Sequence, residues 1–133
     1  FRTEPLDDLD DRTMLSTSLA LADLTGDGLP DVFEVNYLRD PTIARQPATI
    51  DGRTEIVAPL DFKPAIDRLH VNDGSGGRRT MPISDDPAKK ATGLGVVVVD
   101  FDGDGRNEAF IANDVRSDQL WKLGKDGTFS DVA

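Results

Sequence analysis

The sequence predicts an all-β protein built from two four-stranded antiparallel units. Three observations support this fold class. Two Asp-rich loops share the same spacing of acidic residues and glycines. The segments beside the loops are typical of strands: residues 96–99 form a β-branched run before the second loop, and residues 32–37 alternate with period two after the first. The segments that follow each loop also recur in the same order along the chain.

The two loops, residues 23–31 and 100–108, have the spacing of an oxygen-rich metal site. Both place oxygen-bearing side chains at loop positions 1, 3, 5 and 9, with glycine at positions 4 and 6. A tightly curled chain points alternate side chains inward, so positions 1, 3 and 5 converge, and the backbone carbonyl at position 7, from Leu29 or Arg106, fills the gap. Calcium takes six to eight oxygens at about 2.3–2.6 Å. The spacing therefore predicts a calcium site in each loop.

Other interpretations of the loops are weaker. Ordinary Asp-Gly turns between strands explain one such loop, but less readily two with matching ligand spacing. Magnesium demands octahedral geometry and usually keeps several waters. Zinc prefers His or Cys ligands, whereas the chain has no cysteine, and its only histidine, His70, is far from both loops in sequence. We expect His70 to be a structural or surface residue.

An EF-hand is the main rival architecture, because Glu34 stands at position 12 of the first loop. However, Ile111 occupies position 12 of the second loop, and Pro30 occupies position 8 of the first. The flanking patterns also favour strands over helices. We therefore expect Glu34 to be a strand residue and not a ligand, and an EF-hand or dockerin-like module remains an alternative.

The repeated unit reads strand, loop, strand, strand, hairpin turn, strand. Third strands are predicted at residues 67–71 and 118–122, and fourth strands at 80–84 and 128–132. Such a repeated four-stranded antiparallel unit is typical of a β-propeller blade. The predicted divisions are residues 1–6 as the possible last strand of a preceding blade, 7–90 as the first blade with an insertion at 38–65, and 91–133 as the second blade. Residues 50–53 are a candidate hairpin within the insertion.

Residues 99–105 and 126–133 resemble the FG-GAP/VCBS repeats of integrin-like β-propellers. The resemblance implies that the loop between the first two strands of each blade binds calcium, and that the protein is extracellular, at the cell surface or periplasmic. Two residues depart from the family pattern, since Thr25 replaces a carboxylate and Glu108 replaces an Asp, and the Phe-Gly-Gly-Ala-Pro signature of integrins is absent. The implied ligands are Asp23, Thr25, Asp27, the Leu29 carbonyl and Asp31 in the first loop, and Asp100, Asp102, Asp104, the Arg106 carbonyl and Glu108 in the second.

Charge and composition exclude several classes of function. The formal net charge of −10 and the lack of a basic face argue against nucleic-acid binding and against anionic membranes. No apolar run approaches the roughly 20 residues of a transmembrane helix. We expect the acidic run at residues 7–11 to be a solvated loop.

The expected function is that of a scaffold for binding or adhesion, with structural calcium and a protein or carbohydrate ligand. No nucleophile elbow, histidine metal triad or phosphate loop is present, so no catalytic residues are predicted. A non-catalytic part of a calcium-dependent polysaccharide-active enzyme remains an alternative. Two blades leave two apolar faces uncovered, so we expect further blades from the same longer protein or from other copies.

Overall fold

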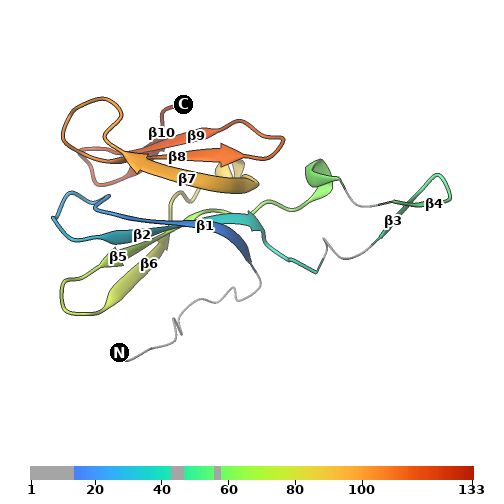
Figure 1. Cartoon of the computed structure of the whole chain (residues 1–133), viewed down its shortest axis with the longest axis horizontal. Helices are drawn as coiled ribbons and strands as arrows, with labels where there is room; N and C mark the ends of the chain where they lie inside the picture. Colours follow the sequence, from blue (N-terminus) through green and yellow to red (C-terminus); the bar gives the residue numbers. More distant parts are fainter. Residues whose placement is uncertain (1–13, 43–46, 56–57) are drawn as a thin grey trace.

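The structure, a computed structural model, describes residues 14–42, 47–55 and 58–133, and it confirms the all-β prediction. Two four-stranded antiparallel sheets form the body, and a two-stranded sheet lies apart (Figure 1). The described part of the chain contains no α-helix, only the short 3-10 turns η2 (Pro59–Asp61) and η3 (Pro87–Lys89). None of its segments is a helix long and apolar enough to cross a membrane. The strand expected at residues 1–6 and the acidic run at 7–11 lie outside the described residues.

Each large sheet is a meander in which neighbouring strands follow one another in the predicted order. The strands of the first sheet are β1 (Leu15–Ala22), β2 (Asp31–Leu38), β5 (Arg68–Asn72) and β6 (Arg78–Pro82). Those of the second are β7 (Gly93–Val99), β8 (Glu108–Asn113), β9 (Gln119–Leu123) and β10 (Phe129–Asp131). The third and fourth strands differ from the predicted ranges by a residue or two at their ends.

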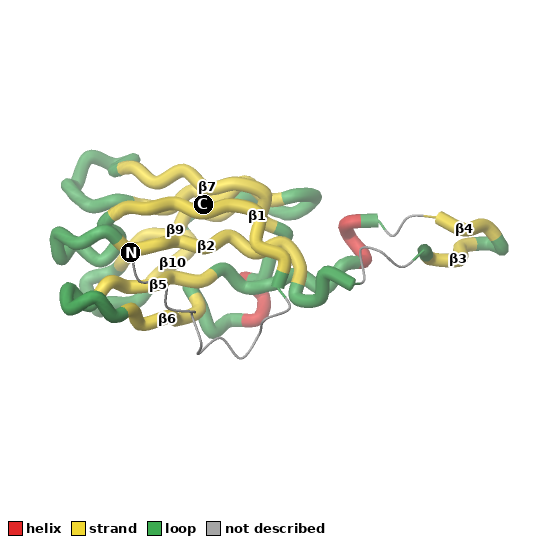
Figure 2. Tube along the Cα trace, turned by 60° about the horizontal axis from the view of Figure 1, so that its bottom comes forward, coloured by secondary structure: helices red, strands yellow, loops and turns green. Residues whose placement is uncertain are grey.

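The insertion in the first repeat carries the small hairpin that the sequence predicts. Strands β3 (Ala48–Ile50) and β4 (Arg53–Glu55) pair through Ile50 and Arg53. Asp51 and Gly52 form the two-residue turn, with φ of 50° and 77°, as a hairpin of this length requires. Figure 2 shows the hairpin projecting away from the two large sheets.

The two repeats share one strand register. In the first sheet Ala20 pairs with Phe33 across β1 and β2, and in the second sheet Val97 pairs with Phe110 across β7 and β8. Ala22 and Asp31 pair in the same way as Val99 and Glu108. Each position of one repeat therefore has a defined equivalent in the other. We name front the face that carries Phe33 in the first sheet and Phe110 in the second, and back the opposite face.

The core lies where the front face of the first sheet meets the back face of the second. From the first repeat it contains Leu24, Phe33, Val35, Leu69 and Ile83, and from the second Ala109, Ile111 and Trp121. Side chains alternate between the two faces of a strand, and the buried residues of β2 and β8 are out of step by one position. Opposite faces of equivalent strands thus come into contact, so the two sheets are stacked in the same sense and not as mirror images.

Polar contacts tie the stacked sheets together. Thr17 Oγ1 donates to the carbonyl of Gly93 at 2.7 Å, and the Tyr37 hydroxyl donates to Asp114 Oδ2 at 2.7 Å. Gly93 faces Val35 so closely that an added Cβ would clash with its Cγ1, so this contact requires glycine. The front-to-back stacking is therefore specific to these residues.

Candidate metal centre

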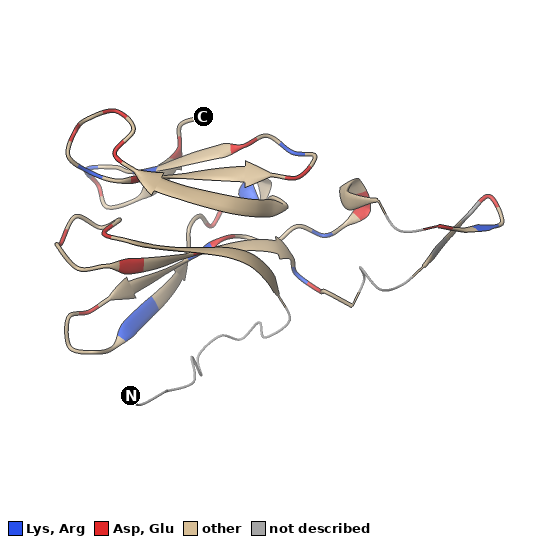
Figure 3. Ribbon diagram, viewed as in Figure 1, with Lys and Arg blue, Asp and Glu red and all other residues tan. Residues whose placement is uncertain are grey.

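Both Asp-rich loops lie at the same end of the two sheets, where acidic residues gather (Figure 3). Each loop joins the first two strands of its repeat, as predicted: the first connects β1 to β2 and the second connects β7 to β8. The loops also contact one another, because Asn107 Nδ2 donates to the carbonyl of Asp23 at 2.8 Å. The sequence repeat thus becomes a pair of neighbouring loops in space.

The first aspartate of each loop folds the loop around its own carboxylate. Asp100 Oδ1 accepts from the backbone N–H of Gly103 at 2.7 Å and of Asp104 at 3.0 Å, and Asp100 Oδ2 accepts from Gly105 at 2.8 Å. Asp23 makes the same three bonds to the residues three, four and five places on, at 2.6, 3.2 and 2.8 Å. Identical spacing therefore gives identical backbone curvature.

In the second loop four carboxylates converge. Oxygens of Asp100, Asp102, Asp104 and Glu108 all lie within 4.8 Å of one another. Like charges at such distances repel, so the cluster favours a cation at its centre. These four residues are the side-chain ligands predicted for this loop, and the structure brings all of them together at a place that could hold a metal ion.

Glu108 is the buried member of the cluster. Its residue is 1% exposed, and its Oε2 accepts from the backbone N–H of Phe101 at 2.9 Å. Its Oε1 is buried too, and its partner among the described residues is the Lys122 ammonium at 3.0 Å, an ion pair without hydrogen-bond geometry. A buried carboxylate oxygen needs a positively charged or hydrogen-bonding partner, a role that either Lys122 or a bound cation can fill.

Lys122 supplies a positive charge to the same oxygens. Its Nζ, on β9, lies 3.0 Å from Glu108 Oε1 and 2.8 Å from Asp104 Oδ2, and it also contacts Asp102. Contacts with the carboxylates of Asp102, Asp104 and Glu108 raise the pKa of Lys122 above its usual value. The bond to Lys122 is the main reason that the pKa of Asp104 is lowered. Sequence reasoning missed this residue, because the spacing of the loop does not reveal the register of β8 against β9.

In the first loop the carboxylates are less assembled. Asp23, Asp27 and Asp31 do not form a group of three within the same distance, in a search of the described residues. Asp31 is fully buried, and backbone N–H groups occupy both of its oxygens: Leu24 and Thr25 donate to Oδ2, and Asn72 donates to Oδ1. Thr25 Oγ1 is buried, and no described residue forms a hydrogen bond with it.

The carbonyls of Leu29 and Arg106 remain predicted ligands of the two loops. Their backbone N–H groups donate to the aspartate at position 5 of each loop, Leu29 to Asp27 at 2.8 Å and Arg106 to Asp104 at 2.9 Å. This places position 7 next to the ligand at position 5 in both loops.

His70 and Glu34 belong to a separate network on the back of the first sheet. His70 is 4% exposed, with Nδ1 2.7 Å from Thr80 Oγ1 and Nε2 2.8 Å from Glu34 Oε2. That last bond is the main reason that the pKa of Glu34 is lowered. Glu34 is thus a strand residue, as predicted, and its side chain contacts His70, which was not predicted. The EF-hand alternative is wrong, because strands flank both loops.

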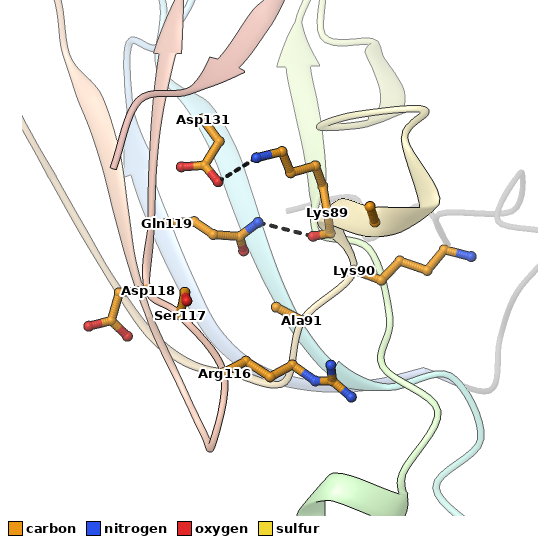
Figure 4. A pocket seen from close by; sticks show the side chains of 9 residues that line it. Lys89, Lys90, Ala91, Arg116, Ser117, Asp118, Gln119 and Asp131 are labelled. Carbon is orange, nitrogen blue, oxygen red and sulfur yellow. Dashed lines mark hydrogen bonds and ion pairs between the residues drawn. The ribbon is translucent and has the colours of Figure 1, made fainter.

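A shallow cleft of about 270 Å³ lies between η3 and the turn from β8 to β9 (Figure 4). The Lys89 ammonium lies 2.9 Å from Asp131 Oδ2, and Gln119 Nε2 donates to the Lys89 carbonyl at 3.0 Å. These contacts fasten η3 to the second sheet, which is a structural role.

A comparison with models of known protein families finds no match to this chain, and no curated protein matches its sequence. The geometry of the loops therefore carries the functional argument.

Proposed function

We propose that this chain is a calcium-binding pair of FG-GAP/VCBS-type repeats, two blades of the β-propeller kind, in an exported protein. The carrying observation is the second loop, where oxygens of four carboxylates, that of the buried Glu108 among them, lie within 4.8 Å of one another. The matching curvature of the first loop supports a second, weaker site.

Calcium fits the donor set better than other metals. All the candidate ligand atoms are oxygens, whereas zinc prefers nitrogen and sulfur ligands. Four carboxylates and a carbonyl can supply the six to eight oxygens that calcium takes, because a carboxylate can bind through one oxygen or two. Magnesium would leave part of this set unused, since it binds six ligands in strict octahedral geometry.

The proposed role of the metal is structural. A cation held by Asp100 at the end of β7 and by Glu108 at the start of β8 would join the two strands across the loop. It would also neutralise carboxylates that repel one another in a chain of net charge −10. Binding or adhesion would then use loops carried by this scaffold, among them the β3–β4 hairpin, with a protein or carbohydrate as the ligand.

Calcium titration calorimetry tests the proposal. We expect two calcium ions per chain, with dissociation constants of about 10⁻⁴–10⁻³ M, as in extracellular modules. The second loop should bind more tightly, because it offers four carboxylates against three in the first. Asp104→Ala should therefore remove the tighter phase and Asp27→Ala the weaker one.

Two outcomes would count against the proposal. If Asp27→Ala removed the tighter phase, the ranking by charge would be wrong. If the wild-type chain took up no calcium at millimolar concentration, the calcium-binding function itself would be wrong. Magnesium titrated in parallel is the control for selectivity.

A further inference from the structure

The front face of the second sheet is apolar and uncovered. Val97 is 56% exposed, Val99 44%, Phe101 50% and Val132 53%. In Figure 1 the second sheet, coloured orange to red, has the first sheet against its back, and none of the described elements covers its front. Soluble proteins rarely expose apolar patches of this kind unless the patch is an interaction site.

The equivalent positions of the first sheet are buried or partly buried. Phe101 corresponds to Leu24, which is 3% exposed, and Phe110 corresponds to Phe33, which is 0% exposed. By the same register Leu120 corresponds to Leu69, also 0% exposed. What covers those residues in the first sheet is the back face of the second. The apolar part of the exposed front thus matches a face that already takes part in such an interface, whereas Lys122 stands where the first sheet has Val71.

The back face of the first sheet has the complementary features. Leu19 and Leu21 are 66% and 70% exposed, and they correspond to Val96 and Val98, which pack into the core from the back of the second sheet. Between the leucines and the sheet edge the Glu34–His70 pair is hydrogen-bonded internally and to Ser16 and Thr80. This pair can therefore be covered without leaving its polar groups unsatisfied.

Charge favours contact between these two different faces. The front of the second sheet ends at the acidic cluster of the second loop. The back of the first sheet carries Arg78. Arg78 pairs with Asn72 in the first sheet and Phe129 pairs with Leu123 in the second, so Arg78 is the equivalent of Phe129. Phe129 packs into the internal interface. In a second interface of the same geometry, Arg78 would lie at the loop end, against the acidic cluster.

We propose that the front face of the second sheet binds the back face of the first sheet of a second copy of this chain, which continues the internal stacking. Such contact is head-to-tail: every chain donates one face and accepts with the other. It therefore produces a ring if the rotation closes and a longer row of copies if it does not.

Two variants with one disabled face each test this arrangement, by light scattering after gel filtration. Val97→Asp places a charge on the front of the second sheet, and Leu21→Asp places one on the back of the first. Both residues are exposed within one chain. We expect wild type to exceed the 14.4 kDa of one chain increasingly with concentration, and each variant alone to stay at that mass.

Mixing the two variants is the decisive step, because each retains the face that the other lacks. The equimolar mixture should form a one-to-one pair of about twice 14.4 kDa. Leu60→Asp, an exposed leucine on η2 away from both faces, is the control and should associate like wild type. Circular dichroism checks that each variant keeps its strands.

Four results would overturn the proposal. Wild type that remains a single chain at high concentration excludes the contact, whatever the variants do. Self-association of Leu21→Asp alone would indicate contact between two front faces, and self-association of Val97→Asp alone would indicate contact between two back faces. Variants that keep their strands but stay separate when mixed would exclude a head-to-tail interface.

Discussion

At the scale of residues, Lys122 and Glu108 define how the second loop responds to a cation. The Lys122 ammonium contacts three of the four carboxylates, including the otherwise unbonded Glu108 Oε1. A calcium ion that binds the same oxygens must displace it. In the first repeat the position equivalent to Lys122 is Val71. Val71 pairs with Arg79 in the first sheet, and Lys122 pairs with Ser130 in the second. The second loop therefore carries an internal competitor for its metal that the first loop lacks.

We predict that Lys122→Met raises the calcium affinity of the second loop several-fold. The reason is that the metal then replaces no competing charge, while the four carboxylates stay in place. Calorimetry with Lys125→Met as the matched control measures the effect, because Lys125 is an exposed lysine outside the acidic cluster. An affinity that is unchanged, or that rises equally in the control, would contradict the competition.

Asp67 is a second residue whose surroundings determine its behaviour. It is 5% exposed at the entry to β5, and its Oδ1 accepts from the backbone N–H of Asn36 at 2.8 Å. Burial is the main cause that raises the pKa of Asp67 to about 7. Asp118 makes the same bond to Asn113 in the second repeat, at 2.9 Å, but is exposed.

Asp67 should make the protein less stable as pH rises from about 4 to about 7. Its pKa in the folded chain is above the value of about 3.9 in the unfolded chain, so the folded state binds more protons in that range. We predict that Asp67→Asn, whose amide oxygen can keep the bond to Asn36, gains stability relative to wild type as pH rises through this window. Urea unfolding at several pH values, with Asp118→Asn as the control for one lost charge, measures it. A constant difference across the window would refute this.

At the scale of elements, the sequence predicted what depends on neighbours along the chain. The strands beside the loops, the tight curl of the loops, and the turn at Asp51 and Gly52 are all local patterns, and the structure confirms them. Contacts between strands that are distant in sequence could not be predicted in this way. Asn72 donates to Asp31 because of the pairing of β2 with β5, and Lys122 reaches Glu108 because of the pairing of β8 with β9.

The loop element depends on glycine at position 4, which allows a direct test. Gly103 has φ of 77°, and an added Cβ would meet no atom within 4 Å. Gly103→Ala should therefore destabilise the chain by about 1–2 kcal/mol through backbone strain alone. Gly95 in β7 also has open space around a new Cβ, without a positive φ, so Gly95→Ala should be neutral or slightly stabilising. Equal effects of the two changes on the free energy of unfolding in urea would show that the loop conformation is not the cause.

At the scale of the whole molecule, the two units were predictable but their stacking was not. Strands such as β7 and β8 are apolar on both sides, so their pattern does not reveal which face meets the other sheet. Which faces meet depends on how the side chains fit together, as where Gly93 faces Val35, and on polar contacts such as that of Tyr37 with Asp114. The loop at the end of β7 and its partner at the end of β1 are brought together by this stacking, so the metal centre and the interface share one set of strands.

Because of this connection, removal of calcium should lower the stability of the whole chain. A ligand that binds only the folded state stabilises it by about 2.7 kcal/mol at 100-fold excess over its dissociation constant. For a chain of this size that corresponds to roughly 10 °C in melting temperature for one site. We predict a fall of this order in excess chelator, with recovery on adding calcium, and strand signal retained below the transition. Because the net charge is −10, any salt will relieve some repulsion, so sodium chloride at matched ionic strength is the necessary control. If sodium chloride raised the melting temperature as much as calcium does, the effect would be charge screening. An unchanged melting curve in chelator would mean that both loops are plain turns.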